Sequence, residues 1–162
     1  MRSLIWFRND LRVDDNPALS NCCVISEEVI AVYFLTESQW EQHNDSKAKK
    51  SFWLRSLVCL EKELQKLNIP LLIIETENYD SIYTSLLKLM QQYDCKSLYF
   101  NNEYPVNELK RDRYIYKSFK EIGFGVFNYH DQVIHPPGSL KTKAGGNFSV
   151  YRELLWLQFV GI

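Results

Sequence analysis

The chain alternates short apolar runs with longer amphipathic segments, five times in succession. The apolar runs lie at 3–7, 29–35, 71–74, 97–100 and 125–129. The segments between them carry apolar residues three or four positions apart, the spacing of a helix that packs one face on a core. Strands that alternate with helices in this way form a parallel sheet covered on both faces. We therefore predict an α/β fold, a Rossmann-like, doubly wound sheet of five parallel strands with helices on both faces, and we expect the runs at 3–7, 29–35 and 71–74 to be buried strands.

Four helices are expected between the strands, the first of them short. They begin at Asn16-Pro17, at Ser46, at Asp80 and at Asn107. Serine, asparagine and aspartate are preferred helix caps, and proline suits the first helical position. The apolar stripe of the second helix is formed by Trp53, Leu57, Leu60, Leu64 and Leu67.

Ligands of doubly wound sheets bind beyond the carboxyl ends of the strands, where the direction of winding reverses. The loops to search are therefore 8–15, 36–46, 75–79, 101–107 and 130–138. The sequence contains no glycine-rich phosphate loop, no serine-nucleophile elbow and no zinc-protease motif. The histidines, His43, His130 and His135, follow strands without a neighbouring nucleophile. Nothing in these loops supports catalysis by the chain on its own.

Composition and charge are those of an ordinary globular domain. Of the 162 residues, 46% are hydrophobic and 24% charged, and the net charge is −1. Such a balance gives no general electrostatic attraction to nucleic acid or to a membrane surface. Aromatic residues make up 14% of the chain, which suits a core, a site for a flat ring or a surface for another domain.

The four cysteines lack the spacing of a zinc site. Cys22 and Cys23 are adjacent, and Cys59 and Cys95 stand alone. We expect reduced, mostly buried thiols and no metal. The N-terminal segment has no apolar stretch long enough for a signal peptide, so we expect a cytoplasmic protein without a membrane partner.

The loop after the first strand is unusually charged, with Arg8, Asp10, Arg12 and Asp14 close together. These side chains could satisfy one another and fix how the chain leaves the strand, or the arginines could face outwards and bind an anion. The alternating signs favour the structural interpretation. On that interpretation, loss of either Asp10 or Arg12 should break a buried network and cost about 2–4 kcal/mol.

Four segments resemble the DNA photolyase/cryptochrome family. LIWFRNDLRVDDNPAL (4–19) is similar to the family's opening strand, charged loop and short helix. YFLTESQWEQHN (33–44), LYFNNEYPVNELKRD (98–112) and HPPGSLKTKAGGNFSVY (135–151) resemble later family segments in the same order. The similarity covers residues 3–151 and is greatest to the folate-type cyclobutane pyrimidine dimer photolyases.

The resemblance implies an N-terminal α/β domain that carries a light-harvesting antenna chromophore. In the family, a helical domain follows, which holds FAD and the flipped-out pyrimidine dimer. Residues 3–134 would be the antenna domain, and 135–162 the start of the interdomain connector with an atypical apolar tail. The FAD-binding helical domain is expected to be absent. The full-length relative would be a deoxyribodipyrimidine photo-lyase that repairs UV-damaged DNA with light, whereas the fragment alone is not expected to repair.

In folate-type relatives, the pterin contacts a histidine after the second strand and an Asn-Glu pair after the fourth. On this sequence, these positions are His43, Asn107 and Glu108. A carboxylate beside an amide can pair with the polar edge of a pterin. The resemblance therefore implies 5,10-methenyltetrahydrofolate as antenna, bound weakly or not at all without the second domain. The alternative from the residues alone is that Asn107 caps a helix and Glu108 lies beside its dipole.

Other interpretations remain open at this point. A deazaflavin or flavin antenna would lie deeper among the strand-end loops, in relatives that lack the Asn-Glu pair. The domain could belong to a cryptochrome photoreceptor, or be a free-standing nucleotide-binding module, against which the missing phosphate loop argues. The expected partners are the helical FAD domain and, in the full-length form only, damaged DNA. A weak homodimer through the bare interdomain surface or the apolar tail is a further expectation.

Overall fold

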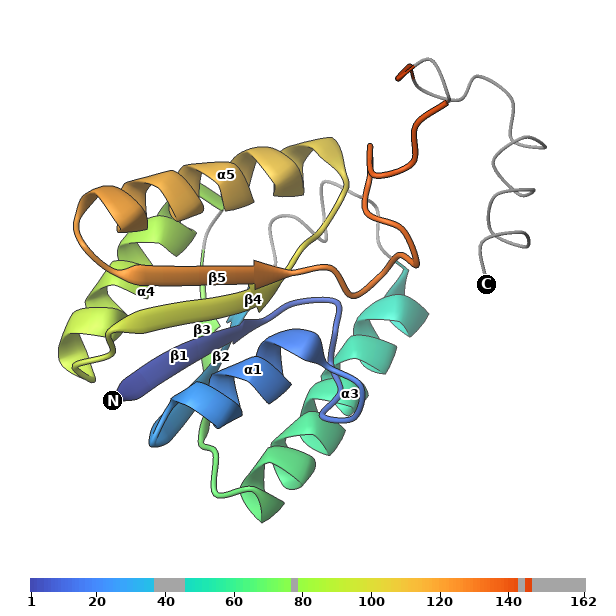
Figure 1. The fold of residues 1–162 in the computed structure, drawn as a ribbon. Coiled ribbons are helices and arrows are strands. Elements are labelled where there is room, and N and C mark those ends of the chain that lie inside the picture. The colour runs from blue at the N-terminus through green and yellow to red at the C-terminus, as the bar shows by residue number, and fades with distance from the viewer. Residues whose placement is uncertain (37–45, 77–78, 143–144, 147–162) are drawn as a thin grey trace. The chain divides into compact units, whose positions relative to one another are not determined.

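The computed structural model describes residues 1–36, 46–76, 79–142 and 145–146. Within these residues five parallel strands form one sheet, in the order β3-β2-β1-β4-β5. The strands are β1 (Arg2–Phe7), β2 (Glu28–Leu35), β3 (Leu71–Glu75), β4 (Ser97–Asn101) and β5 (Gly125–Tyr129). The predicted α/β class and the doubly wound parallel sheet are confirmed (Figure 1).

The four described helices connect the strands and cover both faces of the sheet. They are α1 (Pro17–Ile25), α3 (Lys47–Lys66), α4 (Tyr79–Gln92) and α5 (Val106–Glu121). In Figure 1, α4 and α5 lie on one side of the sheet, and α1 and α3 on the other. This two-sided cover follows from right-handed crossovers that wind in opposite directions from the central strand.

Alternate residues of each central strand enter two separate cores. Leu4 and Trp6 of β1 pack with Leu86 of α4 and Phe119 of α5. The next residues along β1, such as Phe7, pack against α1 and α3 on the opposite face. Because side chains of a strand point to opposite faces in turn, a strand buried on both faces reads as a continuous apolar run.

Strand β3 differs from the prediction of a buried strand. Its residues are partly buried or exposed, and Ile73 is 45% exposed. The reason is its place at the edge of the sheet, where only β2 pairs with it. A short apolar run does not distinguish an edge strand from a central one.

Three predicted helix details need correction. Helix α4 begins at Tyr79, so Asp80 is a helical residue and does not precede the helix. Helix α5 has Pro105 at its N-cap, with no side-chain capping bond, so Asn107 is the second helical residue. In α3, Leu57, Leu60 and Leu64 are buried as predicted, whereas Leu67 is 52% exposed. Leu67 follows the last helical residue, so the helical period no longer directs it to the core.

The chain divides into two compact units, Met1–Asp131 and Gln132–Ile162. The sheet and all four described helices belong to the first unit. Among the described residues, no helix combines the length and the apolar character that crossing a membrane requires.

Candidate functional site

The winding of the sheet reverses between β1 and β4. The chain proceeds from β1 through β2 to β3 on one side, and β4 and β5 are added on the other. Ligands of open α/β sheets bind at the carboxyl ends of the two strands that flank this point. The polar residues that follow β1 and β4 therefore define the first place to look for a site.

A buried network of four charged side chains lies at this point. It consists of Arg8 after β1, Glu103 after β4, and Arg111 and Asp112 of α5, each no more than 9% exposed. Arg8 Nη1 donates to Asp112 Oδ1 at 3.0 Å, and Arg111 Nη2 donates to Glu103 Oε2 at 2.7 Å and to Asp112 Oδ1 at 2.8 Å. Two cations thus face two carboxylates, and the network is balanced in charge.

Aromatic rings complete the environment of both guanidinium groups. The Arg8 guanidinium carbon lies 4.3 Å from the Trp6 ring centroid and 4.8 Å from that of Phe100. The Arg111 guanidinium lies 4.7 Å from the Trp6 ring. Burial by itself would lower the pKa of Arg111, but the charges and hydrogen bonds of Asp112 and Glu103 outweigh it and raise that pKa. Arg111 therefore remains charged inside the fold.

A second buried network joins the loop after β1 to the end of β4. Asp10 accepts hydrogen bonds from the Arg8 backbone N–H at 2.8 Å and from Asn101 Nδ2 at 2.6 Å. Asn16 Oδ1 accepts from Asn101 Nδ2 at 2.8 Å and from the Leu19 N–H at 3.0 Å, which caps α1. The strand ends and the start of α1 are thereby fixed by side chains of the chain itself.

The four loop residues named from the sequence do not act alike. Arg8 and Asp10 are buried in these networks, and Asp14 is exposed. Arg12 is also exposed and forms an ion pair with Asp131 across 119 positions. That pair, through its hydrogen bond, raises the pKa of Arg12. The expectation that Arg12 shares a buried network with Asp10 is therefore wrong.

The two predicted chromophore residues that the structure describes, Asn107 and Glu108, lie at the same edge of the sheet. Asn107 is exposed and Glu108 half-buried, both in the first turn of α5. Because Pro105 occupies the N-cap and no side chain caps the helix, capping does not explain Asn107. His43 lies outside the described residues.

Sequence reasoning did not identify Glu103, Arg111 and Asp112 as neighbours of Arg8. Charged residues of an amphipathic helix are normally solvent-exposed, so nothing local marks Arg111 and Asp112 as buried. The one available signal was the Arg-Asp pair that follows the Asn-Glu pair by four positions, which places it one turn further along α5.

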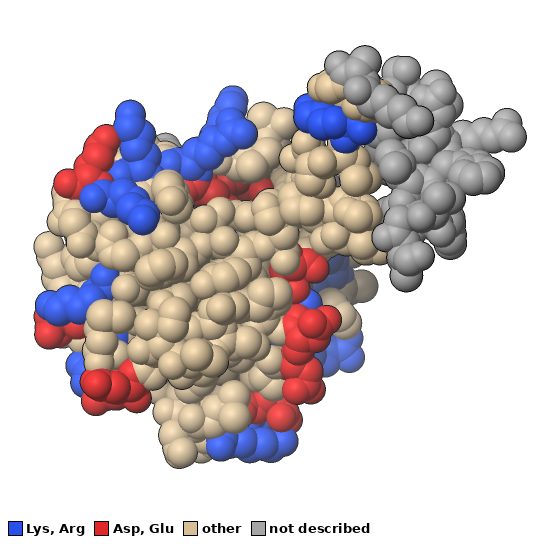
Figure 2. All heavy atoms as spheres, in the orientation of Figure 1, with Lys and Arg blue, Asp and Glu red and all other residues tan. Residues whose placement is uncertain are grey.

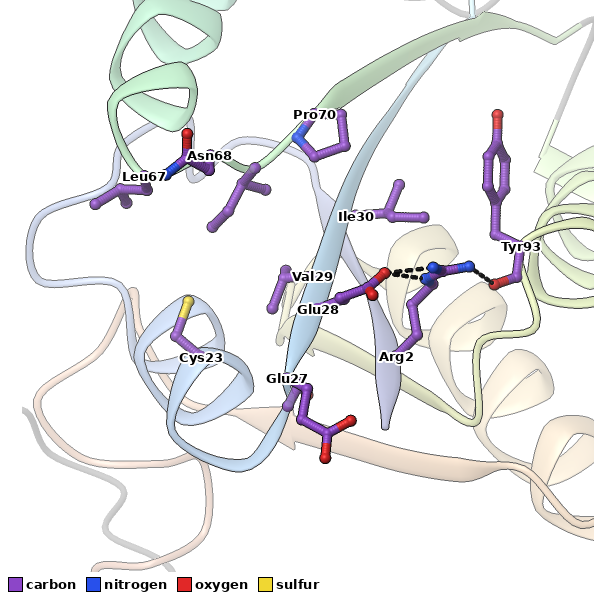
Figure 3. Close-up of a pocket in the computed structure, with 12 residues that line it drawn as sticks. Arg2, Cys23, Glu27, Glu28, Val29, Ile30, Leu67, Asn68, Pro70 and Tyr93 are labelled. Carbon is purple, nitrogen blue, oxygen red and sulfur yellow. Dashed lines mark hydrogen bonds and ion pairs between the residues drawn. The ribbon is translucent and has the colours of Figure 1, made fainter.

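A hollow of about 750 Å³ lies at the opposite, amino-terminal edge of the sheet. Figure 3 shows Arg2 between Glu28 and Tyr93, and Cys23, Leu67 and Pro70 further along the wall. Arg2 Nε donates to Glu28 at 2.6 Å and Arg2 Nη1 to the Tyr93 carbonyl at 2.8 Å. Of the predicted site residues that the structure describes, none lines it.

Charge and metal-binding groups limit what this surface can do. On the face that carries β5 and α1, charged side chains are scattered round the margin and a wide central area has none (Figure 2). This face therefore lacks the continuous basic surface that the DNA backbone requires. In the described part of the chain, no group of three or more His, Cys, Asp or Glu side chains could hold a metal ion.

Comparison with known proteins agrees with the architecture. The profile of the DNA photolyase family matches residues 3–156. A deoxyribodipyrimidine photo-lyase of Buchnera aphidicola from Acyrthosiphon pisum is 34% identical over 151 residues, which are 93% of this chain and 31% of that protein. The chain thus spans about a third of the length of the curated relatives it matches.

Two solved structures share the fold. The bacterial class III photolyase of Agrobacterium tumefaciens superposes with a TM-score of 0.77 over 99% of this chain and 32% of its own. At 24% identity, it shows the fold alone. The Sulfolobus tokodaii photolyase, described with two FAD molecules and a novel light-harvesting cofactor, gives a TM-score of 0.73 at 25% identity, over 88% of this chain and 32% of that one.

The strand order, the charged loop after β1 and the match of the profile over nearly the whole length agree with one another. The chain belongs to the DNA photolyase family.

Proposed function

We propose that this chain is the light-harvesting domain of a deoxyribodipyrimidine photo-lyase. The names of its relatives support repair of pyrimidine dimers as the activity of the whole protein. FAD and damaged DNA would then be bound by the part of the relatives that this chain does not span. The near-neutral charge supports this division, since a domain that binds DNA by itself needs a basic surface. The domain alone would not repair DNA.

The antenna we propose is 5,10-methenyltetrahydrofolate, held by Asn107 and Glu108. The observation that carries this proposal is the Asn-Glu pair in the first turn of α5, at the carboxyl edge of the sheet and without a capping role for Asn107. The carboxylate would accept hydrogen bonds from the amino and ring N–H groups of the pterin, and the amide would fix its orientation. When bound, the folate would absorb light and pass its excitation energy to the flavin. His43 joins the proposed site on the family resemblance alone.

The buried networks favour folate over a flavin placed deeper at the strand ends. Arg8, Glu103 and Asp10 occupy the reversal point between β1 and β4, where the Arg8 N–H bonds Asp10 and both Arg8 and Arg111 pair with Glu103. A flavin or deazaflavin would have to displace these buried, paired groups, which is costly. A ligand that lies outside this layer, at the start of α5, displaces nothing.

An absorption and fluorescence titration of the 162-residue chain with 5,10-methenyltetrahydrofolate tests the proposal, with FAD and FMN as comparison ligands. We expect binding of the folate that is weakened on the order of tenfold or more in Glu108→Gln, because a charged acceptor is lost. Glu121→Gln is the matched control, since Glu121 ends the same helix and its carboxylate lies 3.9 Å from Lys117 at the surface. Tighter binding of FMN than of the folate, or equal effects of both substitutions, would contradict the folate site.

A further inference from the structure

Two aromatic side chains meet at the carboxyl edge of the sheet, outside the residues used so far. Tyr104 lies in the loop between β4 and α5, and His130 directly follows β5. The Tyr104 hydroxyl lies 2.7 Å from His130 Nδ1. Their ring centroids are 6.1 Å apart, and the two ring planes are inclined by only 4°.

These values place the two rings side by side rather than one above the other. The hydroxyl oxygen and Nδ1 both lie in the planes of their rings, so the parallel planes are separated by no more than the 2.7 Å between these atoms. Rings stacked face to face need about 3.5 Å between planes. Tyr104 and His130 therefore lie side by side in nearly parallel planes, and we call the pair the Tyr104–His130 platform.

Neighbouring polar groups hold the platform in place. The Asn102 N–H donates to the Tyr129 carbonyl at 2.7 Å, and Asn128 Nδ2 donates to Asn102 Oδ1 at 2.8 Å. Asn102 Nδ2 lies 3.5 Å from His130 Nδ1. Burial, and then the charge of Asp131, raise the pKa of Tyr104, so its phenol keeps its proton. Hydrogen bonds thus fix both residues, and the phenol of Tyr104 is uncharged.

The position of the platform matches that of the proposed chromophore residues. Tyr104 precedes Asn107 by three positions, and both lie where the chain passes from β4 to α5. His130 is exposed and Tyr104 half-buried, so part of the platform faces solvent. Exposed aromatic rings with fixed orientation are the usual surface on which a flat heteroaromatic ring stacks.

We propose that the Tyr104–His130 platform stacks the flat ring system of the antenna chromophore, while Asn107 and Glu108 bind its polar edge. This inference rests on the proposed function for the position of the ligand, but not on the identity of the chromophore. It assigns Tyr104 and His130 as specificity-determining residues that require a planar heteroaromatic ligand. A purely structural role, in which the pair only ties two loops together, makes a different prediction.

Three variants separate stacking from loop anchoring. Tyr104→Leu and His130→Leu each remove one ring, whereas Tyr104→Phe keeps the ring and removes the hydrogen bond. Tyr116→Leu, at an exposed tyrosine of α5, is the matched control. Dissociation constants of the full chain are measured for 5,10-methenyltetrahydrofolate and FMN. Ribose 5-phosphate serves as a comparison ligand that has no aromatic ring to stack. Thermal unfolding of each variant is recorded to compare stability.

If the platform stacks the ligand, both leucine variants weaken binding of the ring ligands on the order of tenfold. Tyr104→Phe then keeps binding within about threefold, even where its melting temperature falls. In NMR spectra, the ring protons of His130, identified by their absence from His130→Leu, shift upfield when the ligand is added. If the pair only anchors loops, Tyr104→Phe and Tyr104→Leu lose binding and stability together and no upfield shift occurs.

The two proposals can fail separately. Binding of FMN alone, weakened by Tyr104→Leu, would overturn the folate but keep the platform. Folate binding that depends on Glu108 and is unchanged in Tyr104→Leu and His130→Leu would overturn the platform and keep the folate site. Absence of binding by both ring ligands would overturn the platform on this chain.

Discussion

Arg8 Nη1 donates to Asp112 Oδ1 at 3.0 Å, and this bond joins the end of β1 to α5 across 104 positions of the sequence. The same carboxylate oxygen accepts from Arg111. Arg8 Nε and Nη2 have no hydrogen-bond partner within the described residues. Asp112 is therefore the only hydrogen-bonded carboxylate found for the Arg8 side chain in that part of the structure.

Removal of this carboxylate should be strongly destabilising. We expect Asp112→Ala to lower the free energy of unfolding by about 3–5 kcal/mol, because it leaves the buried cations of Arg8 and Arg111 to share one carboxylate, that of Glu103. Urea denaturation followed by tryptophan fluorescence measures the change. Asp94→Ala removes an ion pair with Lys96 that is largely exposed, and it should change stability little. Equal losses in the two variants would contradict a buried, paired role for Asp112.

Asp10 and Arg12 should differ in their effect on stability, although they are two positions apart. Asp10 is 5% exposed and its carboxylate accepts three buried hydrogen bonds, so Asp10→Ala should cost about 2–4 kcal/mol. The Arg12 side chain is 43% exposed, so its own charge stays hydrated, but the Asp131 carboxylate is only 3% exposed and loses its partner, so Arg12→Ala should cost about 1–2 kcal/mol. Urea denaturation of both variants tests the order. A larger loss in Arg12→Ala would contradict it.

The regular elements could be predicted because their signals are local. Continuous apolar runs indicated β1 and β4, which are buried on both faces. Apolar residues three or four positions apart indicated helix α3. The run of β3 gave the same signal, although an edge strand is half exposed, since exposure depends on which strands pair. The start of α5 was placed at Asn107 instead of Val106, because asparagine is a common cap and proline alone gives no capping side chain.

The candidate site could be predicted only in part. The loop that contains Arg8 and Asp10 was recognised from its density of charge. Both residues were correctly expected to bind polar groups of the chain itself. The contacts of this loop with Asn101 and Asp112 could not be predicted, because they require the loop to lie beside β4 and α5, which are about 90–100 positions further along the sequence. The Tyr104–His130 pair could not be predicted for the same reason. In the sequence each is an ordinary loop residue, and only the pairing of β4 with β5 brings the two together.

Accessibility should divide the four cysteines into two classes. Cys23 and Cys59 are exposed, whereas Cys22 and Cys95 are buried, so the expectation of mostly buried thiols holds for two of the four. With an aromatic disulfide reagent, we expect two thiols per chain to react in the native state and four in urea. Mass spectrometry of the labelled peptides identifies them. Fast native labelling of Cys22 or Cys95 would contradict the packing of α1 or of the segment before β4.

Alkaline pH should destabilise the chain through Cys22. Burial raises the pKa of this thiol from 9.0 to about 12, so between these values the unfolded chain loses a proton that the folded chain keeps. Unfolding then releases a proton, and stability falls with rising pH by about 1.4 kcal/mol per pH unit from this group. Cys95, whose pKa is raised from 9.0 to about 11, adds to the slope over the same lower range, and Tyr33, raised from 10.0 to about 12, adds to it above about pH 10.

The contribution of Cys22 can be isolated by comparing slopes. Free energies of unfolding in urea are measured under reducing conditions at about pH 8 and about pH 10.5. Cys22→Ala should lose less stability over this interval than the unaltered chain, by about 1–2 kcal/mol, because the thiol no longer ionises on unfolding. Cys59→Ala, at an exposed cysteine, serves as the control and should keep the original pH dependence. A Cys22→Ala slope equal to that of the unaltered chain would mean that the Cys22 thiol ionises as readily in the folded chain as in the unfolded one.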